Sequence, residues 1–450
     1  MSLSRIRDIV RDQARRESRA APATSGSAAD ADGRAGRELT YAPVDEASAE
    51  GAPADLLSLD GAAWVETGAG RTLVVDRVFA GRQVYGGTSV EHGAIADRAP
   101  LEVLRPRRSD RPSVPPGPGP IVFVDLETTG LSGGAGTVAF LIGCGWFEAG
   151  GFRVRQFVLP SLHQEAPLLH GAAEVLGDAG LLVTYNGNVF DLPVMETRWL
   201  FQRLDAPWDG VAHLDMLPAA RRLWRRRDAA DQSCRLTALE QVLFGVQRRG
   251  DVPGWEIPGR YFHYIRTGDV APLEPVLLHN QLDLLSLALV TARASRLVAD
   301  APDGADAYEA LALGRLLASR GDAERADACF RCAAGDRLAP GEIRAEAMTH
   351  LARGLRRRRL YGDAAEVWRH VLGIRDAGPR WHDEAREALA VHHEHRERRL
   401  DLAHRLVRET LAGAGDTRRR QAAGHRLARL ERKLAAGLWF GSMDEERGSA

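Results

Sequence analysis

The succession of apolar segments between residues 121 and 298 constrains the fold of this chain most. Residues 121–125 read IVFVD, an apolar strand that ends in an acid. Two further strand-like runs, 137–147 and 152–159, flank an Ala-Gly-Gly turn and predict a hairpin. A helix, a buried strand, a second helix and a long third helix are then predicted, at 167–176, 181–185, up to 201 and at about 273–298. Strands and helices in this order predict an α/β domain with a mixed sheet, covering residues 121–300.

The chain before this domain has a different composition. Residues 1–60 contain an amphipathic stretch, 1–18, and then a segment rich in Ala, Gly, Ser and Asp, which predicts disorder over most of the region. Residues 61–105 hold short apolar runs split by glycines and predict a small β accessory region. Residues 106–120 read PRRSDRPSVPPGPGP, and Pro and Gly at this density predict a linker at a domain boundary.

After the α/β domain, residues 303–440 are helical in pattern and contain a recurring motif. Its copies are Ala326-x-x-x-Phe330-x-x-Ala333, Ala364-x-x-x-Trp368-x-x-Val371 and Ala403-x-x-x-Val407-x-x-Thr410. They recur after 38 and 39 residues, whereas tetratricopeptide repeats have a usual period of about 34 residues. The third copy is the least regular. We expect an all-α tetratricopeptide-repeat-like domain, with irregular helical hairpins as the alternative.

Charge and cysteine content limit the functions that the chain can have. The net charge is −1, so any nucleic-acid site must be a local patch or must work through bound cations. The four cysteines are typical of a reducing compartment, and the Cys329-x-x-Cys332 pair lies in a helical pattern that favours packing over metal binding. The N-terminus lacks the apolar core of a signal peptide, and no apolar run is long enough to span a membrane. We therefore expect a cytoplasmic protein without a membrane partner.

The segment FVDLETTGL, residues 123–131, carries the strongest chemical signal. Asp125 ends a buried strand and Glu127 lies two residues on, so alternation places both carboxylates on one side of the chain. Two such charges beside apolar residues are costly unless a cation neutralises them, and Mg²⁺ and Mn²⁺ prefer oxygen ligands. The alternative for this segment alone is a strand that ends in a capped turn, where Asp and Thr residues such as Thr128 are common.

Two other segments bring further polar residues. In YNGNVFDLPVM, residues 185–195, Asn186 follows a strand and Asp191 falls near the start of a helix. In LLHNQLDLLSLALV, residues 277–290, Asp283 lies in an apolar helical run with His279 four residues earlier on the same helical face. Helix capping for Asp191, a turn for Asn186 and a hydrogen-bonded core pair for His279 and Asp283 are the structural alternatives.

Taken together, these segments resemble the DEDD superfamily of 3′–5′ exonucleases, which has a ribonuclease-H-like fold. Asp125 and Glu127 match the first motif of that superfamily, Asn186 with Phe190 and Asp191 match the second, and Asp283 matches the third. The resemblance covers about residues 121–300. It implies a ribonuclease-H-like domain with a mixed sheet, acting on DNA or RNA.

The chain is also similar to bacterial YprB-like proteins, in which a ribonuclease-H-like domain precedes tetratricopeptide repeats. The segments that carry this similarity are LSGGAGTVAFLIG (131–143), HLDMLPAARRLW (213–224), GDVPGWEIPGRYFHYIRTGD (250–269) and HNQLDLLSL (279–287). This resemblance implies the fold and says little about the substrate.

The DEDD resemblance implies phosphodiester hydrolysis by two divalent cations, Mg²⁺ or Mn²⁺, that clamp the attacking and leaving oxygens. Asp125, Glu127, Asp191 and Asp283 are then the metal ligands, and His279 is the general base. In the His-type branch of the superfamily the histidine lies five residues before the last aspartate, and in the Tyr-type branch a tyrosine lies four before it. His279 is four residues before Asp283, so a histidine stands in the tyrosine position.

Substrate contacts are expected from a second set of residues. The segment RRLWRRR offers bidentate phosphate ligands and a tryptophan that could stack on a base, and a solvated helix face with a buried Trp224 is the alternative. The expected substrate-binding residues are Thr128, Asn186, Arg221, Arg222, Arg225, Arg226 and Arg227. The helical repeats are expected to bind a protein partner. A nucleic-acid-binding scaffold with a nuclease-like domain is the alternative function.

Overall fold

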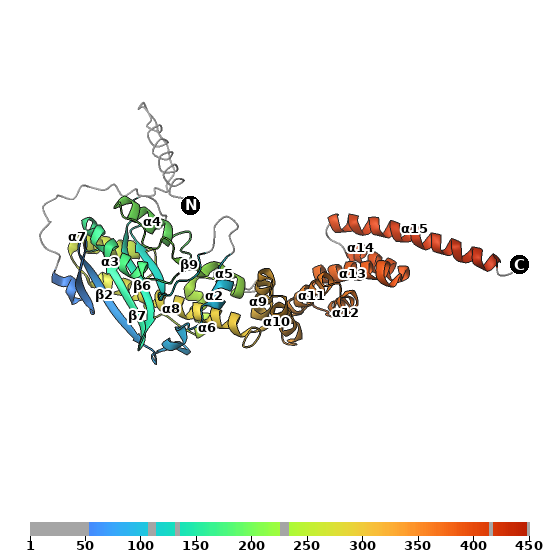
Figure 1. The fold of residues 1–450 in the computed structure, drawn as a ribbon, viewed down its shortest axis with the longest axis horizontal. Helices are drawn as coiled ribbons and strands as arrows, with labels where there is room; N and C mark the ends of the chain where they lie inside the picture. The colour runs from blue at the N-terminus through green and yellow to red at the C-terminus, as the bar shows by residue number, and fades with distance from the viewer. Residues whose placement is uncertain (1–53, 107–113, 131–135, 226–233, 414–416, 448–450) are drawn as a thin grey trace, which may run out of the picture. The chain divides into compact units, whose positions relative to one another are not determined.

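The computed structural model describes residues 54–106, 114–130, 136–225, 234–413 and 417–447 of the chain. Residues 52–450 form one compact unit. Figure 1 shows a sheet flanked by helices, followed in the chain by a wholly helical region. The amphipathic and Ala/Gly/Ser-rich segments predicted at 1–18 and 20–53 lie outside the described residues.

A seven-stranded sheet with the order β1-β2-β7-β6-β5-β8-β9 forms the centre of the first region. Its strands are β1 Ala62–Thr67, β2 Gly70–Ala80, β5 Ile121–Thr128, β6 Ala139–Glu148, β7 Gly151–Val158, β8 Leu181–Thr184 and β9 Ala212–Asp215. β5 pairs in parallel with β8, and β8 with β9, whereas the other neighbours are antiparallel. The mixed α/β sheet predicted from the sequence is therefore confirmed.

The segment predicted as a separate β accessory region is instead continuous with this sheet. β2 pairs with β7 along eight residues, from Leu73 opposite Val158 to Ala80 opposite Gly151. Leu73 is fully buried, so β2 contributes to the central core. Among the described strands, β3 Val84–Tyr85 and β4 Thr88–Ser89 form a two-stranded hairpin apart from this sheet.

Helices cover both faces of the sheet. One core contains the apolar residues Val122 and Val124 of β5 together with residues of α3 Glu165–Gly177, α4 Asp191–Phe201 and α7 Ile257–Thr267. The other contains Phe123 of β5 together with residues of α2 Ala99–Leu104, α5 Met216–Trp224, α6 Leu236–Phe244 and α8 Glu274–Asp300. Because side chains alternate along a strand, Asp125 and Glu127 share the face of Phe123, which is the face that α8 covers.

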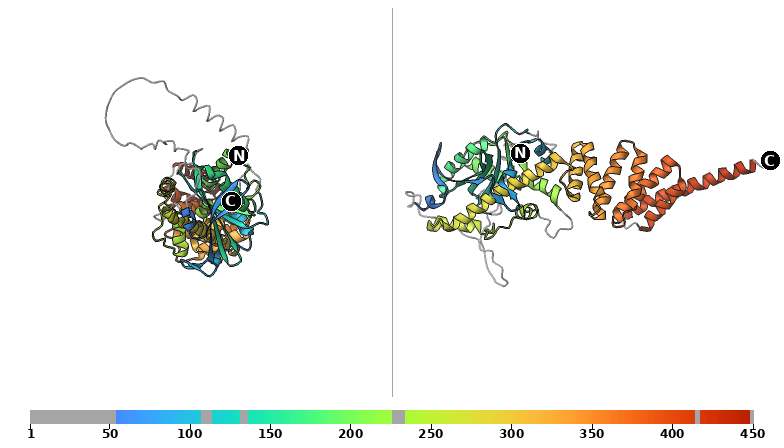
Figure 2. Two further views of the ribbon diagram at one scale, coloured as in Figure 1. Left: turned by 90° about the vertical axis from the view of Figure 1, so that its left-hand side faces the viewer. Right: turned by 90° about the horizontal axis from the view of Figure 1, so that it is seen from below.

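The C-terminal region is a series of stacked helix pairs, which Figure 2 shows in side view. Its helices are α9 Ala307–Arg320, α10 Ala323–Gly335, α11 Gly341–Arg357, α12 Tyr361–Leu372, α13 Pro379–His392, α14 Leu400–Gly413 and α15 Thr417–Arg447. The three copies of the recurring motif lie on α10, α12 and α14, and every motif residue is buried. A Cβ atom at Gly314 of α9 would stand 2.5 Å from the ring of Phe330, so close packing of the first pair needs a glycine there.

Two expectations about chemistry and environment can be placed on this fold. Cys329 and Cys332 both lie on α10, with Cys329 buried and Cys332 exposed. Among the described residues, no helix combines the length and the apolar character that crossing a bilayer requires.

Candidate active site

Two carboxylates project from the carboxyl end of β5. Asp125 and Glu127 are both partly buried and flank the buried Leu126, and the strand register shifts between Glu127 and Thr128. Burial raises the pKa of Asp125 well above its usual range, and the charges of Asp283, Glu127 and Asp191 raise it further. The pKa of Glu127 is also raised, by burial and then by Asp283 and Asp191. The protonation of Asp125 and of Glu127 therefore depends on the charges of the neighbouring acids.

Asp191 joins this pair from the first turn of α4. Its side chain is 5% exposed, and the backbone N–H of Leu126 donates a hydrogen bond to its carboxylate. This bond attaches the start of α4 to β5 between the other two acids. Burial raises the pKa of Asp191 to about 7, against the opposing effect of its own backbone N–H and with a contribution from Asp215.

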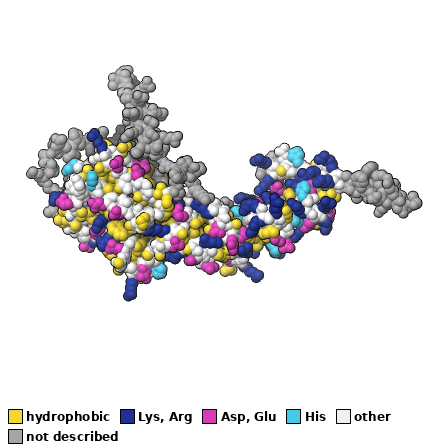
Figure 3. All heavy atoms as spheres, viewed as in Figure 1, with side chains coloured by type: hydrophobic (Ala, Val, Ile, Leu, Met, Phe, Trp, Pro, Cys, Tyr) yellow, Lys and Arg dark blue, Asp and Glu magenta, His cyan; other side chains and the backbone are white. Residues whose placement is uncertain are grey.

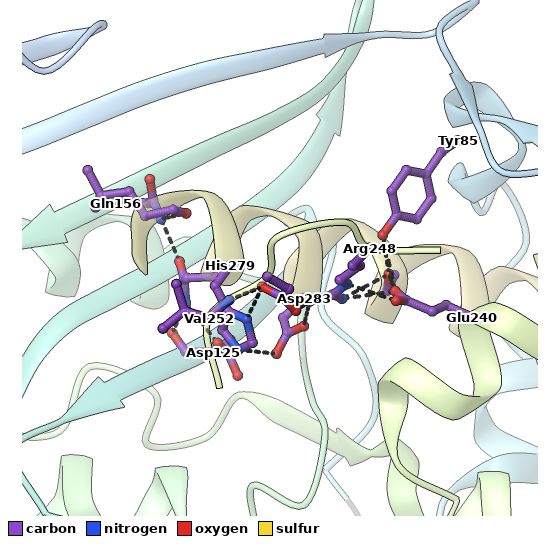
Figure 4. Close-up of polar contacts among 12 residues, drawn as sticks. Tyr85, Asp125, Gln156, Glu240, Arg248, Val252, His279 and Asp283 are labelled. Carbon is purple, nitrogen blue, oxygen red and sulfur yellow. Dashed lines mark hydrogen bonds and ion pairs between the residues drawn. The ribbon is translucent and has the colours of Figure 1, made fainter. Parts of the chain in front are cut away.

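The fourth carboxylate, Asp283, comes from α8. Nη1 of Arg248 lies 2.6 Å from Oδ1 of Asp283, and Nε2 of His279 lies 3.6 Å from Oδ2. One oxygen of Asp283 is thus held by a guanidinium, while the other faces the imidazole. Figure 4 shows Asp125, His279 and Asp283 side by side, with Arg248 on the far side of Asp283. The structure therefore brings together all four acids that the sequence predicted.

Asn280 ties α8 to Asp125. Its Nδ2 donates to Oδ2 of Asp125 at 2.8 Å and to the backbone oxygen of Asp125 at 3.2 Å. Its Oδ1 accepts a 2.8 Å hydrogen bond from Nε2 of Gln156 on β7. Between these strands lies Gly143 of β6, in register with both Asp125 and Gln156. A Cβ atom there would stand 2.2 Å from Oδ1 of Asn280. The Asn280 amide can therefore contact both Asp125 and Gln156 only because residue 143 is a glycine.

His279 is oriented by a fifth acid, Asp251. Nδ1 of His279 lies 2.7 Å from Oδ1 of Asp251. Burial opposes the ionisation of Asp251, but the hydrogen bond from His279 and the charge of Arg248 outweigh it and lower the pKa of Asp251. An ionised carboxylate can only accept, so Nδ1 carries the proton and donates it. In the neutral ring Nε2 is then the acceptor, on the side of Asp283.

Arg248 forms the centre of a buried ionic network that leads away from the carboxylates. Its side chain is 5% exposed and contacts Glu240 through Nε at 2.8 Å and Nη2 at 2.9 Å. Glu240 in turn accepts hydrogen bonds from Ser286 and, at 3.1 Å, from Tyr85. The charges of Asp283 and Glu240 raise the pKa of Arg248 in spite of its burial, which opposes the charged form. This cation is therefore permanently charged and compensates acids on both of its sides.

Two of the predicted substrate-binding residues lie where central strands end, Thr128 as the last residue of β5 and Asn186 two residues after β8. The Thr128 hydroxyl donates to the backbone oxygen of Gly130 at 2.7 Å. Asn186 has a φ of 68°, a left-handed conformation that asparagine tolerates. Its N–H donates to Oδ1 of Asp215 at 2.8 Å, and Asp215 also caps α5 by accepting from the N–H of Leu217. Asp215 therefore fixes the turn that precedes Asp191.

The predicted arginines lie at the other end of α5. Asp215 caps the start of this helix, and Arg221 and Arg222 occupy its exposed last turn, roughly 9–10 Å further along the axis at 1.5 Å per residue. Arg225 follows as an exposed residue, whereas Arg226 and Arg227 lie outside the described residues. Nε1 of Trp224 donates to Oε1 of Glu309 on α9 at 2.9 Å. Trp224 therefore packs between the sheet region and the first helix pair.

The carboxylate cluster suits hard divalent cations. Burial and mutual repulsion raise the pKa values of Asp125, Glu127 and Asp191, and a bound cation would relieve that repulsion. Asn280 holds one oxygen of Asp125 and Arg248 holds one oxygen of Asp283, so a second oxygen of each remains for a cation. Within the described ranges, no three His, Cys, Asp or Glu side chains already stand close enough to hold an ion.

Comparisons with known proteins agree with this architecture. A family model described as the RNase_H superfamily matches residues 122–295. The chain is 28% identical over 322 residues to the uncharacterized protein YprB of Bacillus subtilis (strain 168), across 70% of this chain and 75% of that protein. Residues 122–295 form a ribonuclease-H-like domain.

A solved structure is also similar to part of the chain. It is the family B DNA polymerase from the hyperthermophilic archaeon Pyrobaculum calidifontis, with 14% identity and a TM-score of 0.32. The similarity covers 54% of this chain and 30% of the polymerase, so the chain matches less than a third of that protein.

Sequence reasoning missed the residues that support the carboxylates, namely Gly143, Gln156, Asp215, Glu240, Arg248, Asp251 and Asn280. Asn280 lies beside His279 in the segment that the resemblance singled out, so its polar side chain in an apolar helix was a usable signal. Arg248 and Asp251 lie in a loop with no regular pattern. Asp251 falls in the segment 250–269 that carries the similarity to YprB-like proteins, whereas nothing in the local sequence distinguishes Arg248 from a surface charge.

Proposed function

We propose that this protein is a metal-dependent nuclease that hydrolyses phosphodiester bonds of nucleic acid, acting from the 3′ end with two Mg²⁺ or Mn²⁺ ions. The observation that carries this proposal is the meeting of Asp125, Glu127, Asp191 and Asp283 from β5, α4 and α8. Burial and the charges of neighbouring acids raise the pKa of Asp125 and of Glu127, which supports a site that a bound cation would stabilise. The ribonuclease-H-like fold supports the same chemistry, without defining the substrate.

The carboxylates would hold the two ions, which supply Lewis acidity to the scissile phosphate and to the attacking water. Asn280 and Arg248 keep Asp125 and Asp283 in fixed orientations by binding one oxygen of each. The Leu126 N–H does the same for Asp191. These contacts from residues around the cluster would hold the metal ligands in a defined geometry.

His279 would accept the proton of the attacking water at Nε2. Asp251 binds Nδ1 and so keeps Nε2 unprotonated and directed toward the side of Asp283. The four-residue spacing of His279 and Asp283 places both on one face of α8, which supports a role for His279 at the site. Asp251 is a positioning residue in this scheme, since it contacts His279 and lies behind it.

Thr128 and Asn186 are proposed to contact the terminal nucleotide. Arg221, Arg222 and Arg225 are proposed as contacts to the phosphates that follow, because guanidinium groups bind phosphate bidentately. Replacing these three arginines with Gln is expected to weaken binding and to flatten its salt dependence by roughly 0.7–0.9 per lost contact. An unchanged salt slope would mean that these arginines do not contact phosphate and are only part of a surface helix.

Degradation of 5′-labelled oligonucleotides tests the proposal. The panel contains single-stranded DNA, single-stranded RNA and their duplexes, each with Mg²⁺, Mn²⁺ or EDTA. We expect metal-dependent products that shorten from the 3′ end, and no products with Asp125→Asn or Asp191→Asn. Asp269→Asn, which changes an exposed acid outside the cluster, is the matched control and should cleave like the wild type.

Two results would contradict the proposal. Cleavage at internal positions would refute the action from the 3′ end while leaving hydrolysis in place. Complete absence of cleavage across the panel, in a protein that still binds the oligonucleotides, would refute the enzyme and favour a nucleic-acid-holding scaffold.

A further inference from the structure

Basic side chains gather on the last two helices, α14 and α15. Between residues 400 and 435 the sequence has nine Arg and Lys residues against four Asp and Glu residues, although the whole chain has a net charge of −1. The remainder of the chain is therefore net negative, and the positive charge is local. Figure 3 shows Arg and Lys side chains crowded over these helices on the face in view.

Part of this charge has a structural partner. Glu394, whose side chain is fully buried, contacts Arg426 at 3.2 Å, Arg429 at 2.7 Å and Lys433 at 2.7 Å. These contacts fasten α15 to the turn that follows α13. One negative charge thus faces three positive charges, so this group of side chains keeps a net positive charge.

A second group of arginines has no such partner. Arg405 and Arg408 are exposed and lie three residues apart on α14, and Arg432 is exposed on α15. Arg419 is partly exposed on α15. Within the described part of the chain, none of these four forms an ion pair. We call these four residues, which lie on the neighbouring helices α14 and α15 and on more than one side of α15, the C-terminal basic surface.

The acids at 400–413 and 418–435, where side chains are described, are already engaged in contacts of their own. Their contacts are Asp401 with Arg399 at 3.3 Å, Glu409 with Arg386 at 3.6 Å and Glu431 with His404 at 3.7 Å. Arg419 also lines a cavity of about 290 Å³ between α13, α14 and α15, but Asp383 and Glu387 line it too. Arg418 and Arg426 line the cavity as well, so guanidinium and carboxylate groups are mixed there, and the exposed arginines outside it are the candidates for binding a negatively charged ligand.

We propose that the C-terminal basic surface binds the phosphate backbone of nucleic acid, as a second site separate from the carboxylate cluster. Arginine guanidinium groups match phosphate oxygens bidentately and remain charged at any physiological pH. Contacts of this kind do not read bases, so the binding is independent of sequence. The choice of nucleic acid as the polyanion rests on the proposed nuclease function, for which this surface would hold the strand while its end is cut.

The apolar surface of the same helices argues against a protein ligand. Protein interfaces are anchored by exposed apolar or aromatic side chains that become buried. Among residues 400–413 and 418–435, whose side chains are described, no large apolar side chain is strongly exposed. A surface with excess arginine and no apolar anchor fits a polyphosphate backbone better than a folded partner or an acidic peptide.

Binding of a labelled single-stranded 30-mer to the full chain tests the proposal, by fluorescence anisotropy in EDTA at several salt concentrations. The test variant carries Arg→Gln at Arg405, Arg408, Arg419 and Arg432. The matched control carries Arg→Gln at Arg331, Arg337, Arg356 and Arg357, which are exposed on the earlier helices or their connections. Both variants lose four charges, so a general effect of net charge would appear equally in both.

We expect the slope of log affinity against log salt to fall by about 3 in the test variant, at roughly 0.7–0.9 per lost phosphate contact, and to change little in the control. Hydrolysis of a small chromogenic phosphodiester with Mn²⁺ should be equal in both variants. If the nuclease proposal fails, the small substrate is not cleaved by any of these proteins, and the binding result still stands. Equal affinity and slope in test and control variants, or equally effective competition by polyglutamate of matched charge, would overturn the proposal.

Discussion

Asp251 and His279 form a 2.7 Å hydrogen bond between Oδ1 and Nδ1, although they are 28 residues apart in the sequence. The bond joins a loop to the helix that carries Asp283. It fixes the tautomer of His279, so that Nε2 is left as the acceptor on the side of the carboxylates. A general base needs this arrangement, whereas a histidine that only fills space does not.

Asp251→Asn is therefore expected to slow cleavage about 10²–10⁴-fold, by nearly as much as His279→Ala, because Asn lacks the charge that selects the tautomer. Combining the two changes should add little, since the residues act as a unit. Mn²⁺ affinity, measured by calorimetry, should remain near that of the wild type. Asp269→Asn, which alters the exposed pair of Asp269 with His263, is the control. If Asp251→Asn cleaved at nearly the wild-type rate while His279→Ala was slow, Asp251 would not be needed to position His279.

Arg248→Met should destabilise the fold by about 3–5 kcal/mol, because it leaves Glu240 buried without a cation. Urea unfolding measures the change. Arg260→Met removes a half-exposed i,i+4 partner of Glu256 and should cost at most about 1 kcal/mol. Adding Glu240→Gln to Arg248→Met should recover part of the lost stability. A loss below that of the Arg260 control would show that the buried network is not held together by Arg248.

Gly143→Ala should impair the site without changing any charged group. The added Cβ would stand 2.2 Å from Oδ1 of Asn280 and would push the amide away from Asp125. We expect a stability loss of about 1–3 kcal/mol and weaker Mn²⁺ binding. Gly259→Ala is the control, since it lies in α7 with open space around it and should be neutral or slightly stabilising. Wild-type Mn²⁺ binding by Gly143→Ala would mean that Asn280 does not position Asp125.

Glu394 gives the C-terminal helices a defined pH dependence. Burial opposes its ionisation, but hydrogen bonds from Arg429 and Lys433 outweigh it and lower the pKa of Glu394 to about 2. Because the folded pKa lies below the unfolded value, the stabilisation is fully present above about pH 4.5 and is lost as the pH falls toward 2. Glu394→Gln should cost about 1–3 kcal/mol at pH 7 and much less at pH 2–3, as measured by urea unfolding followed by circular dichroism. An equal loss of stability at both pH values would show that the stabilisation does not come from the ionised carboxylate of Glu394.

The parts of the fold that were predictable have strong local patterns. The hairpin of β6 and β7 was marked by its Ala-Gly-Gly turn, and the long helix α8 by sustained apolar spacing. β1 and β2 were predicted as strands, but their pairing with β7 depends on contacts between segments about 80 residues apart, which local patterns do not encode. β9 and α7 were not predicted, because β9 has only four residues and α7 begins in a Pro- and Gly-containing segment.

The residues of the candidate site that could be predicted also lie in segments with strong local patterns. Asp125, Glu127, Asp191 and Asp283 could be selected from the sequence because each interrupts or ends an apolar element, where a charge needs a reason. Arg248 and Asp251 could not be selected, since their roles arise only when a loop folds against α8. The position of Arg221 and Arg222 at the far end of α5 likewise could not be predicted from their charge, because it depends on where that helix begins.

Direct measurement of Mn²⁺ binding tests the central claim, that the four carboxylates form a divalent-cation site. Calorimetry or electron paramagnetic resonance at pH 8 would give the number of ions per chain for the wild type and for Asp125→Asn, with Asp269→Asn as the control. The account predicts two ions for the wild type and the control, and the loss of at least one in Asp125→Asn, because Asp125 lies among the other three acids. No binding at millimolar Mn²⁺, or identical binding in Asp125→Asn and the wild type, would contradict it.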